Sequence, residues 1–564
     1  MSTPNQSALP LPQRLQRPGG RPPALLWIAL LSAALVSLPL LAVGSQLFAG
    51  GTRATWAHLA ATVLPDYIAT TLWLCAGVGC GVVLLGVGAA WLVTRFEFAG
   101  RAVFEWALVL PLAMPAYVMA YTYTDLLQYV GPLQTALREA TGWRRADYGF
   151  PEVRSTGGAV LMFSLVLYPY VYLLARTALQ ERGGAMLEVA RSLGLSPWQG
   201  FVRVSLPLAR PAIAGGVALA LMETLADFGT VSYFAVQTFT TGIYRAWFAL
   251  GDRAAAAQLA LMLLAFVLGV LVFERASRGG RRFADPSLRR GASGRQALHG
   301  RRALLAGLAC SLPLAGGFVL PGGLLLRMAF NQGDAQFGDR FLGLAGNSVL
   351  LAGLTALLAV ALALLIAYAA RVHRGAPMRW AHRVAGLGYA LPGSVIAVGV
   401  LIPVTRLDHA LAALLQQALG WQPGLLLTGS IAALVYACLV RYLTAALQAV
   451  DAGLARITPS MDLAARSLGH SAAQTLWRVH LPLLRGSALT AGLLVFIDVM
   501  KELPATLVMR PFNFNTLATQ AYTLAADERL AEASTAALAI VAVGLLPMVF
   551  ICRQIAAGQR VASL

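Results

Sequence analysis

The chain of 564 residues is 58% hydrophobic and only 12% charged, and its formal net charge is +19. A soluble protein of this length cannot bury so much apolar surface, which excludes a soluble enzyme and makes a bilayer the expected environment. A nucleic-acid partner is not expected despite the basic balance, because the arginines lie between apolar runs, where loop charge sets orientation.

Apolar runs of about 20 residues, the length that crosses a hydrocarbon core, recur along the chain. The segments between them are too short to hold an attached soluble domain. We therefore predict an all-α polytopic membrane protein that is surrounded by membrane lipid. Its twelve expected spans are residues 24–48, 67–94, 103–128, 157–180, 206–235, 254–274, 303–329, 345–370, 384–405, 425–449, 481–509 and 531–552.

Prolines interrupt the third span at Pro111 and Pro115, and Pro392 interrupts the ninth. Such breaks either line a cavity or kink the helix, and we favour kinks. Tyr121 and Tyr123, near the outer end of the third span, could meet a released cargo, but an interfacial aromatic belt is the favoured explanation.

A repeated segment follows the fourth and the tenth span. The pentapeptide at 190–194 returns unchanged at 465–469, an offset of 275 residues, and the flanking Leu206-Pro207 returns as Leu481-Pro482. This is an internal duplication. Because each copy holds six spans, the two copies enter the membrane from the same side. They are parallel repeats, with a passage expected between them.

Each repeated segment predicts a helix, a glycine turn, a second short helix and a Leu-Pro start to the next span. The polar faces could contact a partner protein, and a short amphipathic loop resting on the bilayer is the alternative. The residues on these faces are Glu188, Arg191 and Arg203 in the first copy and Asp462, Arg466 and Arg478 in the second.

Charged side chains lie inside the fifth and eleventh spans. Glu223 and Asp227 are four residues apart, and Asp498 and Glu502 repeat them at the same offset. Four residues of spacing predict one helix face. Buried charges in a membrane normally face the bundle interior or water, so these residues are candidates for a translocation path. The alternative, equally weighted, is that Lys501 neutralises the acids and all five charges hold helices together.

The segment 275–302 joins the two copies and holds nine arginines against one acid, Asp285. Arginine-rich short loops stay in the cytoplasm, so this linker and both termini are expected there. Arginines before the first span and at 371–383 agree. The predicted organisation is a first repeat at 1–274, a linker at 275–302 and a second repeat at 303–564.

The chain cannot supply its own ATP hydrolysis. A phosphate-binding loop needs a lysine after a glycine-rich turn, and the single lysine, Lys501, follows Met500 with no such turn. We also find no HExxH motif and no serine nucleophile elbow. We expect a transport protein rather than an enzyme, with no cofactor and no stable metal site.

The repeated loops resemble the EAA loop of ABC-importer permeases, a glutamate, an alanine and a glycine followed by Leu-Pro. The first copy has Glu188, Ala190, Gly194, Leu206 and Pro207. In the second, Leu463 occupies the acidic position and Asp462 precedes it; the matching residues are Ala465, Gly469, Leu481 and Pro482. The resemblance implies that both loops dock on a separate ATPase subunit, present in two copies, through unequal contacts.

Residues 223–234, 498–507 and 510–519 resemble the fifth-span signatures of fused ferric-iron permeases. This resemblance implies the type I importer fold, a bacterial inner membrane, a periplasmic iron-binding protein and ferric iron as cargo. Carboxylate oxygens suit ferric ion, a hard cation. Fused thiamine permeases share the general plan and remain an alternative, as does an ion-coupled secondary transporter, against which the paired loops argue.

Overall fold

The computed structural model describes residues 24–48, 50, 53–192, 194–278, 295–331, 338–373, 375–421 and 424–562. Nearly all regular structure in these residues is helical. The exception is one parallel pair of short strands, β1 (Phe96–Glu97) and β2 (Gln296–Ala297). The prediction of an all-α fold is confirmed.

Ten helical segments of the described chain are long and apolar enough to cross a membrane. The first repeat contributes α1 (Ala24–Ser45), α3 (Leu64–Arg95), α7 (Thr156–Ser192), α9 (Leu206–Ala226) and α12 (Arg253–Arg278). The second contributes α13 (Gly300–Leu314) with α14 (Leu320–Asn331), α15 (Asp339–Val372), α17 (Gly393–Leu419), α18 (Ile431–Leu454) and α21 (Leu481–Met500).

The other two predicted spans also coincide with helices. The third is split, because α4 (Arg101–Ala107) and a short turn meet α5 (Ala116–Leu127) and α6 (Pro132–Thr141) at a bend of 93°. The twelfth lies in α24 (Leu530–Ala562), whose apolar described part is Leu530–Leu546. The ninth is shifted: α16 (Ala376–Ala385) ends before Pro392, which lies at the N-cap of α17.

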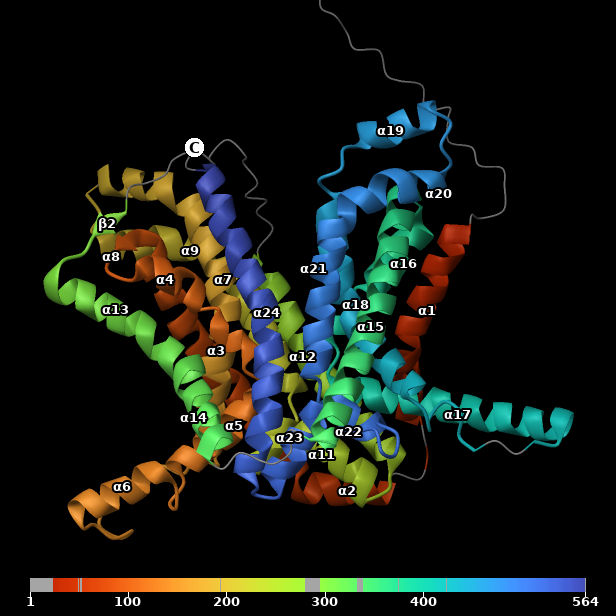
Figure 1. The fold of residues 1–564 in the computed structure, drawn as a ribbon, viewed down its shortest axis with the longest axis horizontal. Coiled ribbons are helices and arrows are strands. Elements are labelled where there is room, and N and C mark those ends of the chain that lie inside the picture. The colour runs from red at the N-terminus through yellow and green to blue at the C-terminus, as the bar shows by residue number, and fades with distance from the viewer. Residues whose placement is uncertain are drawn as a thin grey trace, which may run out of the picture.

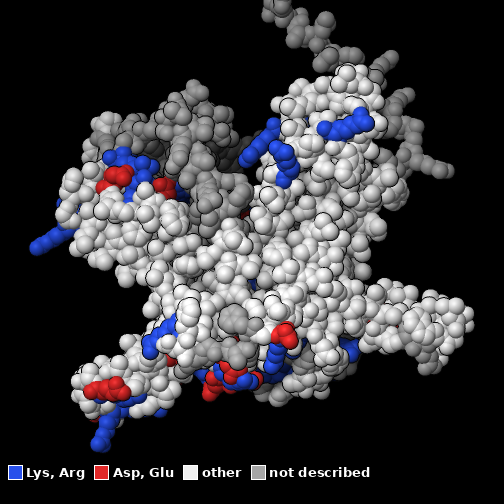
Figure 2. Space-filling model, viewed as in Figure 1, with Lys and Arg blue, Asp and Glu red and all other residues white. Residues whose placement is uncertain are grey.

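The spans run side by side, as Figure 1 shows. On the face seen in Figure 2, charged side chains gather toward the two ends, and the band between them is almost free of charge. Large apolar side chains such as Leu84, Val272 and Leu357 are exposed on the spans. An apolar belt between two charged rims is the surface that a bilayer covers.

The duplication extends to the helices. α3 and α15, α7 and α18, and α9 and α21 start 275 residues apart. The same offset relates the short helices α8 (Pro197–Gly200) and α20 (Ala472–Thr475), and also α10 (Gly229–Tyr233) and α22 (Pro504–Met509). The matched order of elements is what two copies of one folding unit produce.

The first span of each repeat packs on the other repeat. α1 contacts α15, α16 and α17, whereas α13 and α14 contact α3, α4, α5 and α24. Figure 1 shows α1 and α13 on opposite sides of the bundle. The repeats therefore interlock. The remaining helices are α2 (Arg53–Thr62), α11 (Phe239–Tyr244), α19 (Pro459–Ser467) and α23 (Leu517–Ala526).

Candidate translocation site and docking loops

The long helices of the predicted fifth and eleventh spans stop before their second carboxylate. α9 ends at Ala226 and α21 at Met500, and the short helices α10 and α22 follow these breaks. The expectation that the two acids of each pair share one face of a continuous helix is therefore wrong. Asp227 and Glu502 lie outside the long helices.

Both of these acids cap the short helix that follows. The carboxylate of Asp227 accepts the backbone N–H of Thr230 at 2.8 Å and its hydroxyl at 3.1 Å. Glu502 accepts the N–H groups of Ala505 at 3.0 Å and Thr506 at 2.9 Å. Acidic side chains satisfy the free N–H groups at a helix start. This capping explains why the long helices end here.

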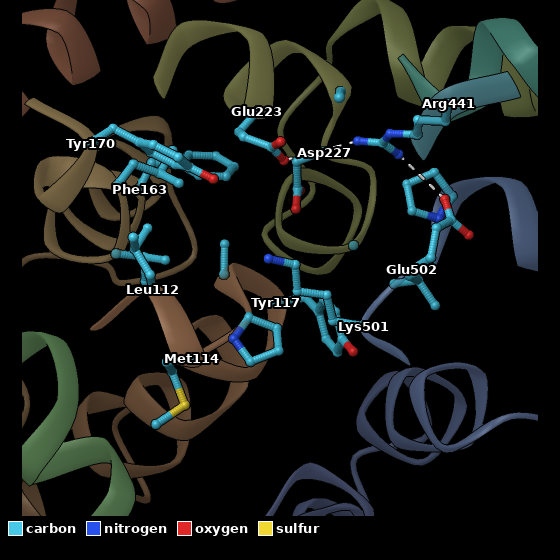
Figure 3. A pocket seen from close by; sticks show the side chains of 18 of the residues that line it. Leu112, Met114, Tyr117, Phe163, Tyr170, Glu223, Asp227, Arg441, Lys501 and Glu502 are labelled. Atoms are coloured by element: carbon cyan, nitrogen blue, oxygen red, sulfur yellow. Dashed lines mark hydrogen bonds and ion pairs between the residues drawn. The ribbon is translucent and has the colours of Figure 1, made fainter. Parts of the chain in front are cut away.

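Arg441 joins the two repeats. It belongs to α18, and its side chain is only 9% exposed. One guanidinium nitrogen lies 3.4 Å from Glu502 Oε1 and the other lies 3.9 Å from Glu223 Oε2. Glu223 comes from the first repeat and Glu502 from the second. Figure 3 shows Arg441 between the two carboxylates.

These charges surround a cavity of about 90 Å³ at the boundary between the repeats. Its polar lining comes from both repeats: Tyr117, Tyr170, Glu223, Asp227, Arg441, Tyr442, Lys501 and Glu502. In Figure 3 these side chains converge from different helices. Four of the five predicted path residues thus line one cavity. The fifth, Asp498, pairs with Lys501 at 3.0 Å instead.

The backbone approaches closely beside this cavity. A Cβ on Gly393 would lie 2.8 Å from Arg441 and 2.9 Å from Glu502. A Cβ on Gly229 would lie 2.7 Å from Leu503 and 2.8 Å from Tyr117. Only glycine fits at such distances, so these two residues let the repeats meet around the charged groups.

The predicted glycine turns of the repeated loops are confirmed. Gly194 and Gly469 both have φ of +79°, a conformation that residues with a Cβ rarely adopt. The N–H of the residue after each glycine bonds to the carbonyl of Ala190 or Ala465, in each case at 3.0 Å. This bond is the helix-ending pattern that such a glycine provides.

The Leu-Pro pair does not open a new helix. A π-turn at Phe201–Ser205 joins α8 to α9, and an equivalent π-turn at Leu476–His480 joins α20 to α21. Pro207 and Pro482 follow immediately. A proline ring collides with the carbonyl four residues earlier in an α-helix, and a π-turn widens the backbone there. Each docking loop is therefore continuous with the helix that reaches the cavity.

Asp462 faces its own bundle. Its carboxylate accepts Arg371 Nε at 2.7 Å and lies 2.6 Å from His480 Nε2, and Arg371 also bonds to the carbonyls of Leu454 and Ile457. Burial raises the pKa of Asp462, but the hydrogen bonds from Arg371 and His480 outweigh it and hold that pKa below its usual value. Asp462 thus anchors α19 to α15 and α21.

The outward face of the second loop is apolar. Leu463 is 65% exposed and Leu468 77% exposed. In the first loop, the side chain of Glu188 lies outside the described residues, while Ala190 is buried. Figure 1 places α8 and α19 at the same end of the bundle, as parallel repeats require.

Comparisons with known proteins agree with this arrangement. Residues 82–278 match the binding-protein-dependent transport system inner membrane component. The molybdenum transport system permease protein ModB of Escherichia coli is 30% identical over 201 residues, which cover 34% of this chain and 84% of ModB. The chain belongs to this family.

Two longer relatives of the permease match most of its length. The Fe(3+)-transport system permease protein FbpB 2 of Haemophilus influenzae is 28% identical over 499 residues, 86% of this chain and 89% of the relative. The ferric transport system permease protein FbpB of Actinobacillus pleuropneumoniae is 23% identical over 519 residues, 86% and 70% of the two chains. The permease is therefore a multi-pass inner-membrane component of a transport system.

Sequence reasoning missed Arg441 and corrected poorly for two features of the third span. A cation within the apolar run 425–449 was the available signal for Arg441. Pro115 lines the cavity, so the disfavoured explanation of this break is right. Tyr121 is buried in the permease core, and the hydroxyl of Tyr123 donates to the carbonyl of Gly316, so the aromatic-belt explanation is wrong.

Proposed function

We propose that this permease forms the membrane passage of an ATP-driven importer that carries ferric iron into the cytoplasm. The single observation that carries the proposal is the carboxylate-lined cavity between the repeats. Similarity to ferric transport permeases over 86% of the chain supports the choice of cargo. We expect a periplasmic binding protein, itself an iron-binding protein, to deliver the cargo at the end opposite the docking loops.

The cavity chemistry suits a transient cation. Glu223, Asp227 and Glu502 offer hard oxygen atoms, which ferric ion favours. Arg441 and Lys501 lie among them and offset part of their charge. A passage must bind its cargo strongly enough to admit it and weakly enough to release it. Mixed charge keeps the carboxylates from becoming a permanent metal site.

The docking loops give an external motor a direct grip on this cavity. α9 starts at the first loop and ends beside Asp227, and α21 starts at the second loop and ends beside Lys501. A helix of about 20 residues is about 30 Å long and transmits displacement along its axis. We infer that two ATPase subunits bind the loops, one each, and that their movement shifts the segments that line the cavity.

The two ATPase contacts differ in this proposal. In the second loop the apolar residues Leu463 and Leu468 present the contact, while Asp462 positions α19 from within. In the first loop the acidic Glu188 takes the position that Leu463 has in the second. Residues Gly194 and Gly469 set the turns, and the Leu-Pro pairs at 206–207 and 481–482 follow the π-turns.

We infer that the docking loops and both termini lie in the cytoplasm. The arginines at 371, 379 and 383 lie at the same end as α19, since Arg371 bonds to Asp462. Basic residues beside membrane spans stay on the cytoplasmic side. The opposite end, with α2, α6 and α23, then faces the periplasm.

Reconstitution in proteoliposomes tests the proposal. The permease is combined with its ATPase and binding protein, and uptake of labelled ferric iron and of labelled thiamine is measured with and without ATP. We expect ATP-dependent uptake of iron. Uptake of thiamine instead of iron would replace the cargo, and uptake driven by an ion gradient without ATP would replace the transport class.

A further inference from the structure

The second repeat carries a basic pocket beside the docking loop that the transport function does not use. The pocket has a volume of about 460 Å³ and lies between the end of α15 and the short helix α16. Its lining consists of Ala370, His373, Met378, Arg379, His382 and Arg383. The segment 371–383 contains no acidic residue.

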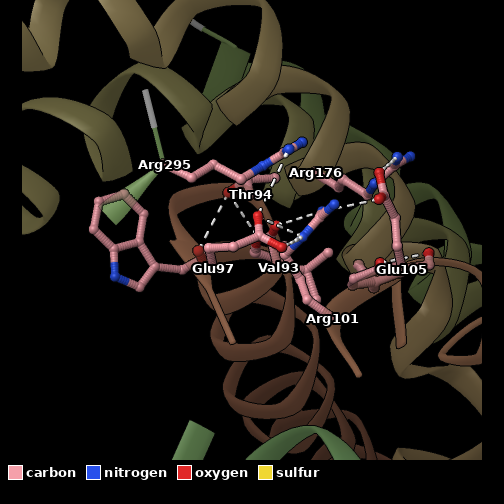
Figure 4. A network of polar contacts seen from close by, with 10 residues as sticks. Val93, Thr94, Glu97, Arg101, Glu105, Arg176 and Arg295 are labelled. Atoms are coloured by element: carbon pink, nitrogen blue, oxygen red, sulfur yellow. Dashed lines mark hydrogen bonds and ion pairs between the residues drawn. The ribbon is translucent and has the colours of Figure 1, made fainter. Parts of the chain in front are cut away.

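The matching place in the first repeat neutralises its cations with its own carboxylates. Arg101 lies 3.1 Å from Glu97 and 2.9 Å from Glu105, and Glu105 also pairs with Arg176. Arg295, next to β2, lies 3.9 Å from Glu97. Figure 4 shows this network. The second repeat keeps the basic residues of this region without the glutamates, so an external anion would complete it.

The surroundings of the pocket are those of a membrane interface. The exposed indole of Trp380 lies beside Arg383, whose guanidinium carbon is 5.8 Å from the ring centre. α16 also packs against α1, whose Trp27 and Leu31 are 59% and 63% exposed on the lipid-facing surface. Tryptophan and arginine together are typical of the headgroup region.

We propose that this pocket binds the phosphate headgroup of an anionic phospholipid, with the acyl chains along the exposed surface of α1. Arg379 and Arg383 contact the phosphate. His382 is held in place by Asp451, 2.9 Å away. Arg371, at the end of the same helix as His373, anchors Asp462 of the docking loop. A bound lipid therefore steadies the α15–α16 corner on which α19 rests. The inference does not depend on which cargo the permease carries.

Native mass spectrometry of the purified permease with phosphatidylglycerol or phosphatidylcholine tests the site. We expect retention of phosphatidylglycerol over phosphatidylcholine, and a loss of roughly fivefold in affinity for each arginine in Arg379→Gln and Arg383→Gln. Arg340→Gln, an exposed arginine at the far end of α15, is the matched control and should bind normally.

Two further arms keep the outcome decisive. Arg383→Lys retains the charge and should retain the lipid, which separates loss of the site from misfolding. Glycerol phosphate, the soluble headgroup, should compete weakly. Equal binding of phosphatidylglycerol to the double glutamine variant and the unmodified permease overturns the proposal. So does glycerol phosphate that binds as tightly as the lipid, because the pocket would then be a site for soluble phosphates.

Discussion

Arg441 of the second repeat faces Glu223 of the first at 3.9 Å, inside the membrane-spanning bundle. The same guanidinium reaches Glu502 at 3.4 Å. At the offset of the duplication, Val166 corresponds to Arg441 and Ala226 to Lys501. Both cations of the cavity thus come from one repeat, although each repeat supplies two acids. The passage is symmetric in its backbone and asymmetric in its charge.

Arg441→Met should destabilise the permease strongly. The variant leaves Glu502, whose side chain is 1% exposed, without its cationic partner. Removing one member of a buried ion pair costs about 3–5 kcal/mol, because the other charge remains buried. Thermal unfolding in detergent measures the loss. Val166→Ala, at the matching position of the first repeat, is the control and should change stability far less; equal losses would show that the ion pairs contribute little.

Glu223→Gln should reduce iron uptake more than Asp498→Asn. Glu223 lines the cavity, whereas Asp498 pairs with Lys501 and does not line it. We expect Glu223→Gln to lower the uptake rate at least about tenfold, equivalent to about 1.4 kcal/mol. ATPase stimulation and the amount of assembled complex are measured in parallel. Normal uptake by Glu223→Gln in intact complexes would leave this carboxylate a purely structural role.

The spans and the duplication were predictable because their signals are local. Apolar runs of membrane length and a repeated pentapeptide survive in a single sequence without any knowledge of packing. Gly194 and Gly469 belong to the same class, since a helix end needs φ above zero wherever it lies. These features depend on residues close together in the chain.

The breaks at Asp227 and Glu502 depend on competition between two local structures. Each acid can continue the long helix or cap the next one, and Thr230 and Thr506 supply the hydroxyls that favour capping. The role of Arg441 was less accessible still. Its partners lie 61 residues or more away in the chain, so no sequence spacing indicates the contact.

Gly393→Ala should disturb the charged cluster without adding or removing a charge. The new Cβ would lie 2.8 Å from Arg441, 2.9 Å from Glu502 and 3.2 Å from Pro504. Overpacking of this kind costs about 1–3 kcal/mol. Gly353→Ala, inside α15, meets nothing within 4 Å and should be neutral or stabilising by up to about 1 kcal/mol. Thermal unfolding of both variants checks the contrast, which fails if they unfold alike.

Asp462→Asn should weaken the coupling between ATPase and permease. The change removes the charge that Arg371 and His480 contact, so α19 loses its anchor to α15 and α21. Hydrogen bonds to charged groups contribute about 1.5–3 kcal/mol each. We expect less ATPase activity stimulated by the permease, with normal cavity properties. Asp339→Asn, at the opposite end of α15, should leave stimulation unchanged. Full stimulation in Asp462→Asn would show that the anchor is dispensable.

His382 should make stability depend on pH. The hydrogen bond from Asp451 raises the pKa of His382, and burial opposes this only in part. The nearby cations Arg379, Arg383 and His373 work in the opposite direction to Asp451. Because the folded pKa is raised, the stabilisation is complete below the unfolded value of about 6.5 and is lost as pH rises through the folded pKa.

The unmodified permease should therefore exceed His382→Gln in melting temperature at pH 6, and the difference should shrink toward pH 9. Thermal unfolding across this range measures it. His409→Gln, an exposed histidine on α17, should show no such trend. A difference that stays constant with pH would mean that His382 acts through packing, because only the charged imidazole gains from the carboxylate of Asp451.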